Sequence, residues 1–160
     1  MENKRETGIT VFLKGMAFVT ALCSLAVAVG RWMSKRSREL EKANVGQKNK
    51  KYLAFMNGKL IKIGKEDVEE IDIKTFAGGV TLDLTRAEIT KDMDVKIQGV
   101  MSGVFIKVPP MVRVVLDGAN IMSGFANMVP NYERKDLPTV FVYAESVMGG
   151  IAVQMVPENE

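Results

Sequence analysis

A tetrapeptide that occurs five times constrains the fold of this chain more than any other feature. It reads apolar, then Met or Ala, then small or polar, then Gly, at residues 55–58, 76–79, 100–103, 121–124 and 147–150. The final glycines are Gly58, Gly79, Gly103, Gly124 and Gly150, with gaps of 21, 24, 21 and 26 residues. Such near-regular self-similarity indicates a repeat architecture in which each unit buries its apolar side against its neighbours.

Apolar and polar residues alternate on both sides of each final glycine. After Gly79, for example, Val80, Leu82 and Leu84 are apolar, and the residues between them are polar. A period of two is typical of a half-buried strand. The sequence therefore predicts an all-β domain, a β-solenoid or β-roll of about four to five rungs with one rung per unit. A meandering β-sandwich is the alternative, because its strand spacing is similar.

We make structural predictions for two kinds of residue in the repeat, the final glycines and the methionines. Each final glycine is expected to supply a positive φ, or to allow backbones to approach closely where the coil turns. The recurring Met56, Met101, Met122, Met148 and Met155 are expected to fill the core. The unit ending at Gly124 is the weakest copy, because Asn127 falls on its inward face.

The N-terminal third contains an apolar run between Lys14 and Arg31, sixteen residues without a charge. With the apolar residues that precede Lys14, the run is long enough for a transmembrane helix over residues 9–33. Trp32 then lies where interfacial aromatic residues are enriched. A cleaved signal peptide remains an alternative, since residues 26–28 resemble a cleavage site, as does a buried or interfacial helix.

The net charge changes sign at the end of this region. Residues 1–51 hold 11 Lys/Arg and 4 Asp/Glu (+7), whereas residues 52–160 hold 11 and 15 (−4), which together give the net +3. Basic residues gather around the apolar run, at Lys14 before it and at Arg31, Lys35, Arg36 and Arg38 after it. The positive-inside rule places the richer side in the cytoplasm. We therefore expect a single-pass anchor in the cell membrane, a basic linker over residues 34–52 and a cytoplasmic β domain over residues 53–157, with no nucleic-acid partner.

Composition removes most catalytic chemistries. The chain has 0 His and 1 Cys, Cys23, which excludes Cys/His zinc sites, a Ser-His-Asp set and an internal disulfide. The glycine pairs lack the spacing of phosphate-binding loops. Residues 66–70 are expected to form a solvated acidic turn, and Asp83 with Glu88 is not expected to form an acid pair. We thus expect no enzyme, catalytic residue, cofactor, metal site or small-molecule substrate. Outward Phe105, Tyr132 and Tyr143 are a candidate contact patch.

Four segments carry a family resemblance. Residues 76–89 (FAGGVTLDLTRAEI), 100–109 (VMSGVFIKVP), 114–118 (VVLDG) and 147–151 (VMGGI) resemble successive repeats of the C-terminal domain of LiaF-type proteins, the cell wall-active antibiotics response family. The resemblance covers roughly residues 53–156. It implies a cytoplasmic β-solenoid on a membrane anchor that acts through protein contacts in bacterial envelope-stress signalling. Family members usually carry several membrane helices, whereas this sequence predicts one.

Two functions follow as hypotheses. The first is a non-enzymatic, membrane-anchored interaction module whose partner is another membrane protein or a second copy of the chain. The second is a self-assembling structural protein similar to bactofilins, which are polymerising β-helical cytoskeletal proteins, although bactofilin repeats are shorter and more regular. Unpaired strands at the ends of a stack make end-to-end assembly physically natural.

Overall fold

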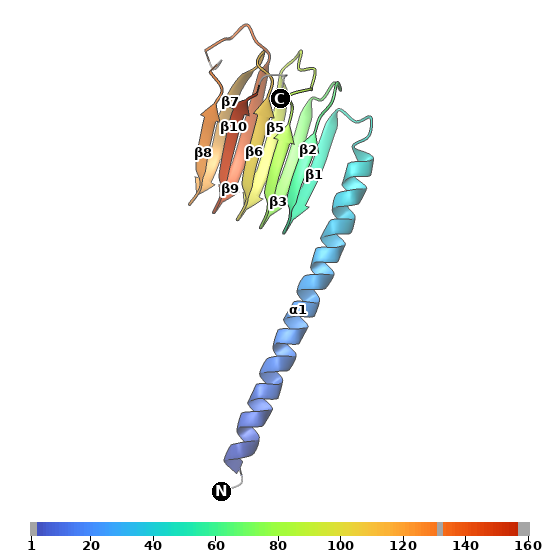
Figure 1. The fold of residues 1–160 in the computed structure, drawn as a ribbon, viewed down its shortest axis with the longest axis vertical. Helices are drawn as coiled ribbons and strands as arrows, with labels where there is room; N and C mark the ends of the chain where they lie inside the picture. Colours follow the sequence, from blue (N-terminus) through green and yellow to red (C-terminus); the bar gives the residue numbers. More distant parts are fainter. Residues whose placement is uncertain (1–2, 131–132, 157–160) are drawn as a thin grey trace.

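The chain folds into one long helix followed by ten strands (Figure 1). The structure, a computed structural model, describes residues 3–130 and 133–156. Helix α1 spans Asn3–Ala43. The strands are β1 (Asn49–Phe55), β2 (Gly58–Lys62), β3 (Glu70–Phe76), β4 (Gly79–Asp83), β5 (Met93–Val100), β6 (Gly103–Val108), β7 (Arg113–Ile121), β8 (Gly124–Met128), β9 (Thr139–Val147) and β10 (Gly150–Met155). The predicted combination of an apolar N-terminal helix and a β domain is confirmed.

The strands form two five-stranded sheets in which every pairing is parallel. The first sheet has the order β1-β3-β5-β9-β7 and the second has the order β2-β4-β6-β10-β8. Each repeat unit gives one strand to each sheet, and the tetrapeptide joins the two strands. Parallel pairing excludes the meander alternative, in which successive strands would pair antiparallel. The five final glycines lie in register across the second sheet, because Gly79 pairs with Gly58 and Gly103, and Gly150 pairs with Gly103 and Gly124.

The units do not stack in sequence order. Strands β9 and β10 of the fifth unit lie between those of the third and fourth units, so β7 and β8 form one end of the stack. This position explains why the fourth unit is the weakest copy. Asn127 pairs in register with the fully buried Val153, but it has no further rung beyond it and is exposed. Its amide donates to the Val114 carbonyl at 3.1 Å, which closes the end of the core with a polar group.

The core consists of aliphatic columns between the two sheets. Predicted inward residues of the second sheet are buried, among them Val80, Leu82, Ile106 and Val153, so the alternation that predicted them is confirmed. The first sheet contributes equivalent columns, such as Ile73 paired with Ile97. Burial of these side chains supplies the main driving force for folding of the β domain.

Helix α1 covers the other end of the stack, where β1 would otherwise be an open edge. The Asn44 side chain pairs with the backbone of Lys51, accepting from its N–H at 2.8 Å and donating to its C=O at 2.9 Å. The Ser37 hydroxyl donates to the Leu53 carbonyl at 2.7 Å. Lys59 Nζ donates to the Ser37 hydroxyl at 2.8 Å and lies 2.9 Å from a Glu41 carboxylate oxygen. These bonds tie the last turns of α1 to the first rung.

The linker predicted over residues 34–52, as a short helical extension followed by a solvated tether, is shorter and more ordered in the structure. Residues 34–43 continue α1, and β1 begins at Asn49, four residues before the predicted start of the β domain. Asn44 and Lys50 are buried, and Lys50 Nζ lies 2.6 Å from a Glu66 carboxylate oxygen. The sequence predicts solvated polar residues here because their partners, such as Glu66 for Lys50, come from other parts of the chain. The predicted domain end at residue 157 lies outside the described residues.

The turn edge, which we define as the five tetrapeptides, forms one edge of the β domain. Positive φ occurs there at the second position of each tetrapeptide, at Met56, Ala77, Met101, Met122 and Met148, and not at the final glycines. The expectation that those glycines supply positive φ is thus wrong. The expected core position is wrong for the four turn methionines, which are exposed, with Met122 81% exposed. Met155 is partly buried and packs against the core as predicted. At the tetrapeptides, the methionines with positive φ thus lie outside the core.

Candidate interaction groove

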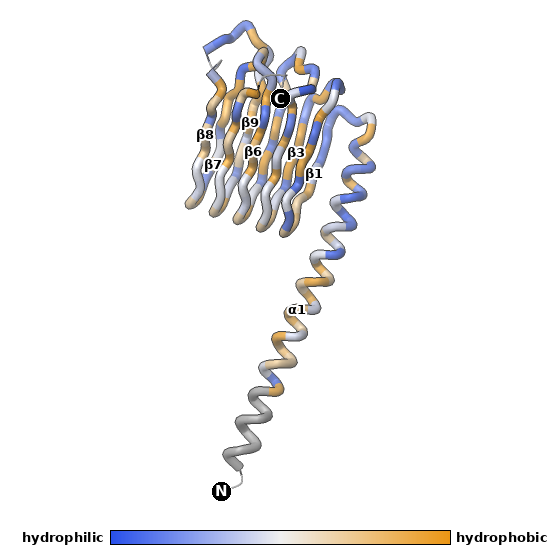
Figure 2. The backbone as a smooth tube through the Cα atoms, viewed as in Figure 1, coloured by the Kyte–Doolittle hydropathy of each residue, from blue (hydrophilic) through white to orange (hydrophobic). Residues whose placement is uncertain are grey.

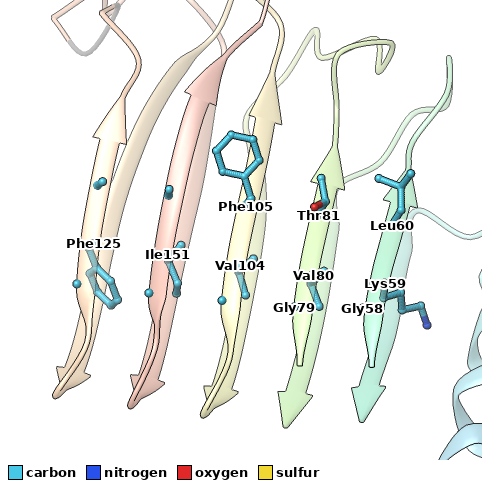
Figure 3. Close-up of a pocket in the computed structure, with 15 residues that line it drawn as sticks. Gly58, Lys59, Leu60, Gly79, Val80, Thr81, Val104, Phe105, Phe125 and Ile151 are labelled. Carbon is cyan, nitrogen blue, oxygen red and sulfur yellow. The ribbon is translucent and has the colours of Figure 1, made fainter. Parts of the chain in front are cut away.

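A shallow groove runs across the outer face of the second sheet (Figure 3). The five in-register final glycines line it along one side. The other side is lined by the residues two positions after each glycine, which lie on the same face of the sheet. They are Leu60, Thr81, Phe105, Ala126 and Ala152. The groove has a volume of about 800 Å³ and crosses all five strands. We call it the glycine groove.

Nothing inside the chain requires glycine at most of these positions. A Cβ atom built on Gly58, Gly103 or Gly124 would meet no atom within 4 Å, and none of the five final glycines has a positive φ. The expectation of a close backbone approach at these positions is therefore wrong. Glycine lowers the intrinsic stability of a strand, so five such positions in one row carry a cost without an internal benefit. Their effect is to leave the groove open.

The close approach falls one residue earlier, in the third position of the tetrapeptide. A Cβ on Gly78 would lie 2.2 Å from the Asn57 carbonyl oxygen, and one on Gly149 would lie 1.9 Å from the Ser102 carbonyl oxygen. Along the stack, these glycines alternate with Asn57, Ser102 and Ser123. Repeat reasoning missed this requirement because the third position varies along the sequence, and its alternation appears only in the spatial order of the rungs.

The lining of the glycine groove is mostly apolar. Leu60 is exposed, and Phe105 and Ala152 are partly exposed on the outer face. Lys59, the one charged residue in the lining, is held by Glu41 and by the Leu53 carbonyl at the α1 end. Five strands spaced about 4.8 Å apart give a track about 19 Å long, which matches about 13 residues of a helix. The groove therefore suits an uncharged, apolar segment of another protein.

The outer face of the first sheet has a different character. Lys96 lies 2.8 Å from a carboxylate oxygen of Glu70, and the Gln98 amide donates to Glu145 at 3.0 Å. A smaller hollow of about 390 Å³ on this face has Lys74, Lys96, Gln98 and Glu145 in its lining. Of the candidate contact patch, Phe105 lies on the second sheet and Tyr143 on the first, so the structure does not bring them together. Tyr132 lies outside the described residues.

The acidic residues within 66–70 form ion pairs with three lysines, Lys48, Lys50 and Lys96. Lys48 Nζ lies 2.9 Å from Asp67 and 2.6 Å from Glu69, and these hydrogen bonds raise the pKa of Lys48. The hydrogen bond from Lys48 lowers the pKa of the Asp67 carboxyl. Within residues 3–130 and 133–156, no group of three or more Asp, Glu or Cys residues is arranged to hold a metal ion.

Asp83 and Glu88 do not form an acid pair. The Asp83 carboxylate accepts from the Thr85 hydroxyl at 2.6 Å and from its backbone N–H at 3.1 Å. Burial raises the pKa of Asp83, but the hydrogen bonds from Thr85 outweigh burial, so the pKa lies below its ordinary value. Asp83 thus holds the turn after β4, a local role that the sequence does not distinguish from an exposed acid.

The basic residues predicted to flank a membrane lie along α1. Arg31, Lys35, Arg36 and Arg38 are exposed after the apolar run, and Arg36 pairs weakly with Glu39 at 3.8 Å. Lys14 lies near the other end of the run and is exposed. Apolar side chains of the run are exposed as well, including Phe18, Leu25 and Val27. Figure 2 shows the hydrophobic stretch along the middle of α1. Across the described part of the chain, α1 is the one helix long and apolar enough to span a membrane.

Comparison with known proteins gives few relatives. No family model matches the chain, and no solved structure matches it significantly. Two proteins of Mycobacterium tuberculosis are similar to it, Uncharacterized protein Rv0966c of strain H37Rv and Uncharacterized protein MT0994 of strain CDC 1551. Each is 30% identical over 86 residues, which is 53% of this chain and 43% of the relative. The chain thus spans less than half the length of these curated relatives.

Proposed function

We propose that this chain is a non-enzymatic, membrane-anchored protein-interaction module. The single observation that carries the proposal is the glycine groove. Neither backbone conformation nor internal packing explains glycine at Gly58, Gly103 and Gly124, whereas an external segment lying against the sheet does. The resemblance to LiaF-type regulators supports the same class of function, in which the partner is a membrane protein of envelope-stress signalling such as a sensor kinase.

Anchorage of the module rests on α1. Its uncharged run crosses the membrane once, and the basic residues from Arg31 to Arg38 keep the β domain in the cytoplasm. Confinement to a membrane raises the effective concentration of the β domain near other membrane proteins, which favours weak but specific contacts. The groove runs along the side of the domain nearest this anchor, where the membrane-proximal segment of a partner would lie.

For the β domain, we propose classification as a β-roll related to β-solenoids. In-register glycines, aliphatic columns and parallel pairing support this class. Placement of the fifth unit between the third and fourth distinguishes it from a simple coil.

The alternative, a bactofilin-like filament, has less support. End-to-end stacking needs two open ends, and α1 occupies the backbone groups of Lys51 and Leu53 at one of them. Among the described strands, the β7/β8 end has no such cover, and at the α1 end the edge strand β2 contacts α1 through the Lys59 side chain. One open end allows a pair of chains to associate, but not a continuous filament, unless α1 is displaced.

A photo-crosslinking experiment tests the proposed function. A benzophenone amino acid replaces Thr81 in the groove or, as a control, Gln98 on the first sheet, in the full chain in membranes of the source organism. We expect a specific crosslinked membrane protein from position 81 only, and we expect Gly103→Val to abolish it by filling the groove. Equal crosslinking from both positions, or crosslinking unaffected by Gly103→Val, would contradict the proposal.

A further inference from the structure

The turn edge and the opposite edge of the β domain differ sharply in charge. None of the five tetrapeptides of the turn edge contains Asp, Glu, Lys or Arg. At the opposite edge, the loops after β2, β4 and β8 carry many charges, including Glu66, Asp67, Arg86, Lys91 and Arg134. The domain is thus polarised along its strand direction.

The turn edge exposes a continuous row of apolar side chains. Exposed members include Met56, Phe76, Val100, Met101, Ile121, Met122 and Met148. They come from all five rungs, which lie side by side, so the row crosses the full width of the domain. A contiguous apolar row of this kind on a domain surface marks an interaction site.

Helix α1 fixes where this row lies relative to the membrane. It runs without a break from the apolar segment to its contact with β1, and β1 runs back toward the apolar segment (Figure 1). At the turn, Phe55 and Asn57 line a hollow together with Met33 and Ser34 of α1. The turn edge is therefore level with the residues that directly follow Trp32.

This level coincides with the expected interfacial layer of a bilayer. Arg31 ends the uncharged run, and Trp32 is 64% exposed one residue later. Tryptophan and basic residues at the end of a spanning helix mark the lipid headgroup region. In Figure 1 the row of turns extends sideways from α1 at this level, and the apolar segment continues beyond it on the same side.

We propose that the turn edge is a second membrane contact, whose exposed methionine and aliphatic side chains lie in the interfacial layer of the bilayer that α1 crosses. This inference rests on the proposed membrane anchorage. A lipid surface fits better than a protein partner here because the side chains form a shallow row without charges or a pocket. Flexible methionine side chains adapt readily to such a fluid surface.

The contact would orient the β domain. With the turn edge against lipid, the strands stand upright from the membrane and the glycine groove lies just above the headgroups. The charged loops then point away from the bilayer into water. A partner segment that emerges from the same membrane would meet the groove at its own level.

Depth-dependent fluorescence quenching tests this contact in the full chain. The protein is reconstituted at one copy per nanodisc of phosphatidylcholine and phosphatidylglycerol, and an environment-sensitive nitrobenzoxadiazole label is attached to a single cysteine. Native Cys23, which is exposed in the apolar run, reports whether α1 is inserted. In a Cys23→Ser background, Met122→Cys reports on the turn edge and Glu88→Cys on the opposite edge.

We expect spin-labelled lipids with a shallow label to quench the probe at position 122 at least twofold more than the probe at position 88. Replacing Met101 and Met148 by Glu is expected to reduce that quenching toward the control value. The result that overturns the inference is equal quenching at positions 122 and 88 while the Cys23 probe is quenched by deep spin labels. The inference is also overturned if the probe at position 122 is protected from water only in nanodiscs that hold two copies. That result would favour a contact between copies.

Failure of the anchorage itself gives a different result. If the Cys23 probe is not quenched by lipids with a deep spin label, α1 is not inserted, and both the proposed function and this inference are contradicted. The Cys23 probe thus separates the two proposals. The circular dichroism of each labelled variant, compared with that of the unmodified chain, confirms that the β domain is intact.

Discussion

The two sheets have nearly identical inner faces, but their outer faces differ in the part that lies beside the turn edge. Both sheets have five parallel strands in matching order, and both bury aliphatic columns. Outside, the first sheet carries Lys74, Lys96 and Glu145, whereas the second carries the glycine row and Phe105 beside the turn edge and a charged row, Lys62, Asp83 and Lys107, only farther along its strands. The comparison teaches that the repeat fixes the core, while the outer positions are free to differ, and we propose that the glycine groove on one outer face carries the function.

Core truncations should show that the inner faces are equivalent. Ile73→Ala in the first sheet and Ile106→Ala in the second each remove a fully buried side chain. We expect each to lower the free energy of unfolding by about 3 kcal/mol, since such cavities cost about 2–5 kcal/mol. Urea titration of the full chain in detergent, followed by circular dichroism, measures both. A large cost for one variant and almost none for the other would break the equivalence.

Glycine substitutions sharpen the contrast between the outer face and the turn. Gly149→Val should destabilise the chain by about 3 kcal/mol, because its Cβ would overlap the Ser102 carbonyl oxygen. Gly103→Val, on the groove, should change the free energy of unfolding by no more than about 0.5 kcal/mol, because no atom lies within 4 Å of its Cβ. The same urea titration compares the two. Similar losses of unfolding free energy in the two variants would mean that the groove glycines are required for the stability of the fold.

The covered edge of the first sheet offers a test of how α1 is held. Asn44→Ala removes two hydrogen bonds to the Lys51 backbone and leaves a buried site unpaired. We expect a loss of about 1–2 kcal/mol and faster hydrogen exchange at Lys51, measured by mass spectrometry. Asn120→Ala, at an exposed position of β7 at the other end of the stack, is the matched control. Unchanged exchange at Lys51 would show that α1 does not protect this edge.

The smallest expected effect is a pH dependence that arises from exposed ion pairs in the loops. The pKa of Asp67 is lowered by its hydrogen bond from Lys48, and Arg134 lowers the pKa of Asp136 to about 2. A lowered folded-state pKa gives stability that is present above the ordinary value of 3.8 and is lost as the pH falls through the folded-state value. Asp67→Asn should therefore flatten the decline in unfolding free energy below pH 4. A pH profile identical to that of the unmodified chain would show that the Lys48–Asp67 ion pair does not contribute to stability.

The sequence predicts the helix, the β class and the buried residues, because strict alternation and an uncharged run are local signals. It does not predict the spatial order of the rungs, since the return of β9 between β5 and β7 depends on competition among similar strands. It also misassigns the turn methionines, because hydrophobicity suggests burial while the positive φ at Met101 or Met122 turns the side chain outward.

The groove itself was visible only in part. The glycine repeat is evident in the sequence, but the roles of its positions are not. Gly149 is required by a close backbone approach, and Gly103 is free of internal contacts, a distinction that depends on the neighbouring rung. The sequence likewise does not indicate that Lys50 and Lys59 are held in place, because their ion-pair partners Glu66 and Glu41 are distant in sequence.

Thiol accessibility in native membranes tests most directly that the second sheet carries the binding face. Thr81→Cys and Gln98→Cys, each in a Cys23→Ser background, are modified with a membrane-impermeant maleimide in open membrane fragments and, for comparison, in purified protein in detergent. We predict that modification at position 81 is about tenfold slower in native membranes than in detergent, whereas position 98 reacts at the same rate in both. Equal rates at position 81, or protection of position 98 instead, would contradict the account.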